Sequence, residues 1–167
     1  MVYEFIVKLL GAGIASTLYF LPFQIHYSTN LLSIEASLNA PITSDMEQLI
    51  KKGFNLKIQY SFTIIINDRR SYSANAINHI TFYRKWQVND SIIVNEHLQK
   101  KAGNAAAQFN HFTFDEGDTL LVFVNAHILP DDGFTQSTGF QPSILWSYYV
   151  PRAQETYLFK NGAFAKQ

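Results

Sequence analysis

The 167-residue chain contains no cysteine. This absence excludes disulfide bonds, thiolate catalysis, cysteine-ligated zinc sites and attachment to lipid through a lipobox cysteine. The chain also has no excess of either charge, because 13 Lys and Arg residues balance 13 Asp and Glu residues. Without a net positive field there is no general attraction for nucleic acid. We therefore expect no nucleic-acid partner.

The motifs that carry common enzyme chemistry are missing as well. The sequence has no G-x-S-x-G nucleophile elbow, no Gly-rich phosphate loop and no H-E-x-x-H zinc motif. His111 and His127 lie on neighbouring predicted strands with Asp131 and Asp132 nearby, but scattered histidines on strands are more often ordinary sheet residues than metal ligands. The sequence therefore predicts no catalytic residue, no metal site and no cofactor.

What the chain does have is a large apolar and aromatic content. Hydrophobic residues make up 47% of it and aromatic residues 15%, with 14 Phe and 9 Tyr. This is enough to build a core, and aromatic side chains pack well on the pleated surface of a sheet. The length fits one domain.

The N-terminal segment resembles a targeting signal. Residues 9–23 carry no charge and follow Lys8, the order of a signal peptide, and the run is shorter than the roughly 20 apolar residues of a spanning helix. A buried core helix is the alternative, although Gly11 and Gly13 would weaken it. We predict that residues 1–27 are a signal peptide or an N-terminal membrane anchor. The protein would then be exported, either periplasmic or anchored in the cell envelope with this segment contacting the membrane, and cleavage stays open.

Residues 31–39 alternate strictly between apolar and polar residues, which predicts a half-buried strand. Residues 56–66 alternate in the same way until Ile65 makes that end apolar on both sides, which predicts a long strand that is central towards its end. Between them, Ser44 and Glu47 have the spacing of a capping box and Gly53 suits the position just after a helix. This pattern predicts one short helix over residues 44–52.

Further strands are expected along the rest of the chain. Asn89-Asp90 and Asn161-Gly162 are typical of tight hairpin turns. The segment 99–108 allows either a turn of helix or a connection. The remaining expected elements are strands 77–88, 91–98, 109–114, 119–129, 144–150, 156–159 and 163–165, a hairpin turn at 115–118, and loops 67–75 and 130–142.

Strands at this spacing predict a mainly β fold with one short helix, in which residues 28–167 form a single domain. The expected architecture is an antiparallel β-sandwich, and a lipocalin-like β-barrel is the alternative.

Six residues are candidates for binding. Arg69 and Arg70 lie in a predicted loop and could hold a carboxylate or phosphate group, since guanidinium is a planar fork of donors. An open aromatic sheet face would bind sugar, peptide or lipid, and its candidates are Trp86, Trp146, Tyr148 and Tyr149. Both sets also have a structural interpretation. The two arginines would lie at a solvated loop tip, and the four aromatic residues would belong to the core.

The order of these features resembles an uncharacterised family of small exported bacterial β-rich domains. The likeness runs over about 110 residues: the strand from residue 31, the capped helix, Lys52-Gly53-Phe54-Asn55-Leu56-Lys57-Ile58, the pair around Tyr83 to Trp86, and Leu129-Pro130 followed by Ile144-Leu145-Trp146-Ser147. The resemblance implies an envelope location and a β-rich fold. It assigns no functional residue.

Three functions remain in competition. The leading hypothesis is a non-enzymatic cell-envelope domain that binds or scaffolds a protein partner through sheet edges or an aromatic face. The alternative is a protein that holds an apolar ligand such as lipid. A third hypothesis is a glycan-active enzyme that uses a carboxylate pair, with candidates Asp115, Glu116, Asp118, Asp131 and Asp132. The sequence leaves the oligomeric state open.

Overall fold

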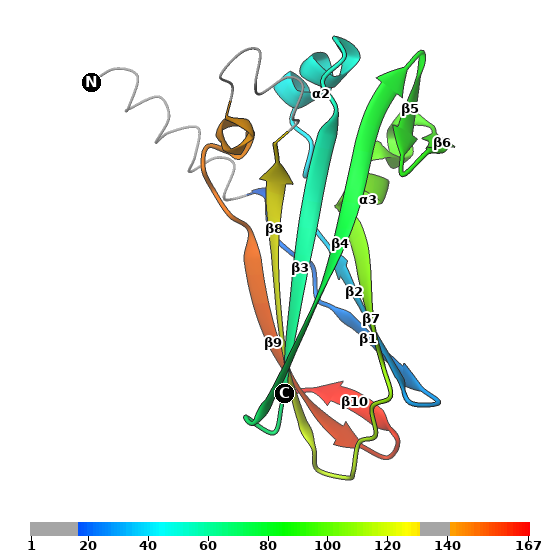
Figure 1. Ribbon diagram of the computed structural model, residues 1–167, viewed down its shortest axis with the longest axis vertical. Coiled ribbons are helices and arrows are strands. Elements are labelled where there is room, and N and C mark those ends of the chain that lie inside the picture. Colours follow the sequence, from blue (N-terminus) through cyan, green and yellow to red (C-terminus); the bar gives the residue numbers. More distant parts are fainter. Residues whose placement is uncertain (1–16, 131–140) are drawn as a thin grey trace, which may run out of the picture.

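The computed structural model describes residues 17–130 and 141–167. They form two antiparallel sheets that lie as facing layers (Figure 1), so the predicted β-sandwich is confirmed. The smaller sheet has the order β1-β2-β7, with bounds Gln24–Ser28, Leu31–Ser37 and Asn104–Asn110. The larger sheet has seven strands in the order β10-β9-β8-β3-β4-β5-β6. Their bounds are Ala163–Lys166, Arg152–Lys160, Thr119–Leu129, Leu56–Ile66, Arg70–Tyr83, Lys85–Val88 and Ser91–Ile93.

The centre of the larger sheet is β3, which has the bounds that its alternating sequence predicts. It pairs with β4 on one side and β8 on the other. Its inward side chains are fully buried as far as Ile64 and form the middle of the core together with inward residues of β2 and β8. One face of each sheet therefore supplies the core, and the other face remains outside.

The predicted helix is also present, as α2 (Ser44–Lys51), and Gly53 follows it with φ of +104°. The capping residue differs from the prediction. Thr43, one residue earlier than Ser44, is the N-cap, and its hydroxyl accepts a hydrogen bond from the Met46 backbone N–H. Thr43 can do this because its backbone is extended, the conformation that an N-cap requires.

The predicted loop 67–75 is wrong, because β4 already begins at Arg70. The chain reverses at Asn67 and Asp68, which both have positive φ. Both are residue types that tolerate this conformation. β4 then runs for 14 residues before Arg84, also at positive φ, separates it from β5. The turn at Asn89 and Asp90 is confirmed and joins β5 to β6.

Two segments near the middle of the chain also differ from their predictions. The expected strand 91–98 ends at Ile93, and a short 3-10 helix η1 (Asn95–His97) and helix α3 (Leu98–Gly103) follow it. The expected hairpin between 109–114 and 119–129 is wrong, because β7 pairs with β2 in the smaller sheet. The acidic segment at 115–118 therefore connects the two sheets and does not close a hairpin.

Near the C-terminus, the predicted strand 144–150 is wrong. Residues Pro142–Trp146 form the 3-10 helix η2, and Ser147 and Tyr148 follow with positive φ. The hairpin at Asn161 and Gly162 is confirmed as the link between β9 and β10. Of the expected loop 130–142, residues 131–140 lie outside the described residues.

Residues 17–27 overlap the predicted targeting segment and are packed into the sandwich. Leu18 and Phe23 are buried, and β1 pairs with β2 along its whole length. The first 16 residues lie outside the part of the chain that the structure describes. Within the described ranges, no helix has the length and apolar character needed to cross a bilayer. Export of the protein stays a prediction.

Candidate functional site

The longest unpaired stretch of backbone in the larger sheet lies on β4. This strand pairs with β3 from Arg70 to Ile80, but it pairs with β5 only from Ile80 to Tyr83. Figure 1 shows β5 and β6 beside one end of β4 only. From Arg70 to His79 the strand is therefore hydrogen-bonded to a neighbouring strand on one side only, although β7 of the smaller sheet packs close to part of it.

The backbone groups that face this open side can be identified from His79. Its carbonyl accepts from the Asn89 N–H at 2.9 Å, and its N–H donates to Asn89 Oδ1 at 2.8 Å. In an antiparallel strand the N–H and C=O of one residue point to the same side, and successive residues alternate. The same side therefore receives the backbone groups of Ser71, Ser73, Asn75 and Ile77, which we call the open β4 edge.

The open β4 edge has the chemistry of a surface that can accept another strand. All four residues are exposed, including Ile77 at 51%, and their outward N–H and C=O groups have no partner among the described residues. Proteins usually protect such edges with Lys, Pro or a bulge. From residue 71 to residue 78 this strand has no charged residue and no proline. The edge is therefore unprotected against pairing.

The other sheet edges offer less unpaired backbone to an added strand. The terminal strands of the larger sheet are short, with three residues in β6 and four in β10. β7 is the other long strand with one partner, but the carbonyl of its first residue, Asn104, already accepts from Asn78 Nδ2 of β4 at 2.7 Å.

A groove of about 570 Å³ lies where the open β4 edge begins. Its lining includes Arg69, Arg70, Tyr72 and Phe112. The rings of Tyr72 and Phe112 meet edge to face, with their centroids 4.7 Å apart. The two arginines make no ion pair within the described residues. The structure therefore brings the two predicted arginines together at one end of the open β4 edge.

The four predicted aromatic residues do not share one open face. Trp146 is 2% exposed, and its indole N–H donates to the Pro41 carbonyl at 2.9 Å. Trp86 is also buried, with Lys51 Nζ 5.7 Å from its ring centre. Tyr148 is exposed and Tyr149 is half-buried, both just after η2. The two tryptophans are core residues. Trp86 lies on a buried position of β5 and Trp146 on a buried position of η2, and their rings fill space inside the sandwich.

The carboxylates of the third hypothesis have structural partners where the structure describes them. Asp118 accepts from Asn67 Nδ2 at 2.7 Å and from the Asp115 N–H at 2.8 Å, and Glu116 accepts from the Asn161 N–H at 3.0 Å. Asp131 and Asp132 lie outside the described residues. Among the described residues, no group of three His, Asp or Glu side chains is placed to hold a metal ion. His127 is exposed on β8 beside Gln59, whereas His111 lines the groove.

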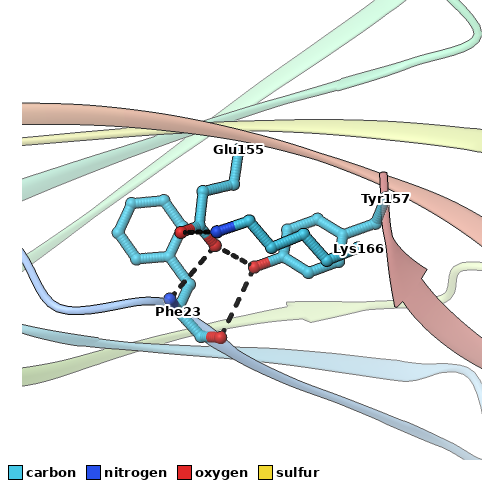
Figure 2. Close-up of polar contacts among 4 residues, drawn as sticks. All are labelled: Phe23, Glu155, Tyr157 and Lys166. Atoms are coloured by element: carbon cyan, nitrogen blue, oxygen red, sulfur yellow. Dashed lines mark hydrogen bonds and ion pairs between the residues drawn. The ribbon is translucent and has the colours of Figure 1, made fainter.

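One partly exposed cluster of polar contacts joins the two ends of the described chain (Figure 2). The Glu155 carboxylate accepts from the Phe23 N–H at 3.1 Å, from Lys166 Nζ at 2.5 Å and from the Tyr157 hydroxyl. Burial alone would raise the pKa of Glu155, but these hydrogen bonds and the Lys166 charge lower it. Burial, and then Glu155, raise the pKa of Tyr157. The Glu155 carboxylate accepts these three hydrogen bonds and so connects the segment around Phe23 to β9 and β10. We therefore interpret the cluster as a structural contact.

Sequence reasoning identified the arginines but not the open β4 edge. The signal was present, because residues 71–76 alternate between small polar side chains and Tyr72, Ala74 and Ala76. Polar composition concealed the strand, and only the pairing of β5 with one end of β4 makes the remainder an edge.

Comparison with known proteins gave no significant match to a family model, a curated protein or a solved structure. The resemblance to small exported bacterial domains therefore stays a prediction from the sequence.

Proposed function

We propose that this protein is a non-enzymatic domain of the cell envelope that binds a protein partner by strand addition along the open β4 edge. In strand addition, main-chain hydrogen bonds supply affinity and the flanking side chains supply specificity. The observation that carries the proposal is the row of four exposed residues whose outward backbone groups have no partner within residues 17–130 and 141–167.

The envelope location is proposed from the sequence, on the basis of the charge-free residues 9–23 after Lys8. The groove at the end of the open β4 edge supports a role for Arg69 and Arg70 in contacting the partner, because neither guanidinium group has an ion-pair partner in the part of the chain that the structure describes. Tyr72, which is 38% exposed, adds an aromatic surface next to them.

The alternative of an apolar ligand held inside the sandwich has less support. The hollows of about 570, 340 and 150 Å³ are lined at least in part by exposed and charged residues. The side chains between the sheets, by contrast, form one continuous buried cluster. At one end of this cluster the rings of Phe114, Phe159 and Phe164 are packed against one another.

The test is a pair of substitutions at Ser73. Ser73→Pro removes the outward N–H, and it leaves the ladder to β3 intact because residue 73 bonds on the other side; proline is tolerated at such edge positions. Ser73→Ala is the matched control, since both variants lose the 3.1 Å side-chain contact with Thr63 and the control keeps the N–H.

The readout is a photo-cross-linking amino acid placed at Ile77 in producing cells. We expect a protein adduct that persists in Ser73→Ala and falls about tenfold in Ser73→Pro, because a central main-chain hydrogen bond is lost and the facing carbonyl of the partner is left without a donor. Equal adduct yield in the two variants, with both folded, would show that the open β4 edge is not the binding surface.

A further inference from the structure

We propose that the strand added at the open β4 edge is β4 of a second copy of this chain, so that the protein forms a twofold dimer with one continuous sheet. This inference rests on the proposed function, because it names the partner at the same edge. Antiparallel pairing of identical strands has twofold symmetry, the commonest symmetry of protein dimers.

The backbone groups of the open β4 edge are self-complementary. When two copies are placed antiparallel with Ala74 on the twofold axis, Ser71 lies opposite Ile77 of the second copy, and Ser73 lies opposite Asn75. Each such pair brings together two residues whose backbone groups face outward, and a pair of this kind exchanges two hydrogen bonds. The four pairs satisfy all the outward groups of the open β4 edge in both copies.

The side chains agree with the same register. Tyr72 lies opposite Ala76 of the second copy, a large residue beside a small one, and Ala74 lies opposite itself. On the other face, small polar Ser71 and Ser73 lie opposite Ile77 and Asn75. No like charges meet directly across the pair, and such a meeting would be destabilising.

The charges at the two ends of the open β4 edge are complementary. Arg69 and Arg70 lie at one end, and Asp90 lies at the other, in the turn whose Asn89 bonds to His79. None of these three side chains has an ion-pair partner among the described residues. Antiparallel pairing brings the arginine end of each copy to the Asp90 end of the other. This match favours a second copy over an unrelated strand.

A single cysteine can test the register because the chain has none of its own. In the proposed dimer the two residues at position 74 form a pair without mutual hydrogen bonds, whose Cα atoms lie about 4.5 Å apart, within the range that a disulfide requires. Under mild oxidation, we expect most of an Ala74→Cys variant of the full chain to become a disulfide-linked dimer.

Ala76→Cys is the matched control. It replaces another half-buried alanine of β4, but in this register the two cysteines lie four residues apart along the strands, roughly 13 Å, so no disulfide should form. Adding Ser73→Pro to Ala74→Cys should abolish the linked dimer, and adding Ser73→Ala should not.

Equal cross-linking of the two cysteine variants, or none in Ala74→Cys, would overturn the dimer. The proposed function would survive that result if the adduct at Ile77 contains a different protein and still depends on the residue 73 N–H. Loss of both effects would reject the two proposals together.

Discussion

At the scale of single residues, polar side chains hold the sandwich together at a few buried points. Asn78, 5% exposed, donates to the Ala102 and Asn104 carbonyls at 2.9 and 2.7 Å, and its own oxygen accepts from Asn89. The Tyr60 hydroxyl donates to the same Ala102 carbonyl at 2.7 Å. Burial raises the pKa of Tyr60 and keeps it a neutral donor. Because a buried polar group without a partner costs free energy, these bonds fix how β4 lies over α3 and β7.

Glu155 should make the stability of the protein depend on pH. Its pKa is lowered in the folded state, so its ionised form favours folding, and this contribution is present above the ordinary Glu pKa and is lost as pH falls through the lowered value. Glu155→Gln should therefore lower the free energy of unfolding by about 1 kcal/mol near neutral pH.

Urea unfolding of both proteins, from about pH 7 down to about pH 3, measures this effect. The difference between the two free energies of unfolding should shrink with decreasing pH. A difference that stays constant over the whole range would show that the charge of Glu155 does not stabilise the fold.

At the scale of elements, local sequence patterns predicted those elements whose cause is local. The strand at residues 56–66, helix α2 and the turns at Asn89-Asp90 and Asn161-Gly162 follow from alternation, helical spacing and turn chemistry. Pairing between distant segments did not follow. A strand was expected at residues 109–114 beside 119–129, whereas β7 (Asn104–Asn110) pairs with β2. The strand predicted at residues 144–150 is absent, because a 3-10 helix with aromatic residues around it has the same amino-acid composition as a strand.

The candidate site was likewise predictable only where its residues stand out in the local sequence. Arg69 and Arg70 stand out in any polar stretch, and the structure places them at the groove. Trp86 and Trp146 stand out equally, but burial depends on which elements cover them. The open β4 edge is a property of strand order, which a single sequence does not specify.

The junction of α3 and β7 depends on a close approach of two backbones. A Cβ at Gly103 would lie 2.2 Å from the Leu38 carbonyl oxygen, while the Gly103 carbonyl accepts from the Leu38 N–H at 2.9 Å. Gly103→Ala should therefore destabilise the protein by about 1–3 kcal/mol through steric overlap.

Gly117→Ala provides the comparison for this junction. Gly117 has φ of +90° and open space around its Cβ position, so its substitution should cost about 1–2 kcal/mol from backbone strain alone. Thermal unfolding of both variants should show a Gly103→Ala protein at least as destabilised as Gly117→Ala. A Gly103→Ala protein with wild-type stability would mean that the two backbones can separate freely.

At the scale of the whole molecule, the sandwich has a continuous core and one long unpaired edge in its larger sheet. The larger sheet continues through β5 and β6 at one end of β4 and stops at the other (Figure 1). An unprotected edge of this kind favours association with another strand. We therefore propose that the backbone of β4 binds the partner and that Arg69, Arg70 and Tyr72 are the neighbouring side chains that select it.

Amide hydrogen exchange along β4 tests this claim most directly. The N–H groups of Ser71, Ser73, Asn75 and Ile77 should be protected in the associated protein and should exchange rapidly after dilution to the monomer. In Ser73→Pro, which has no N–H at residue 73, the other three should exchange rapidly at every concentration. The intervening N–H groups, which bond to β3, should stay protected under all conditions. Rapid exchange at the four edge residues in every state, concentrated or dilute, would contradict the account.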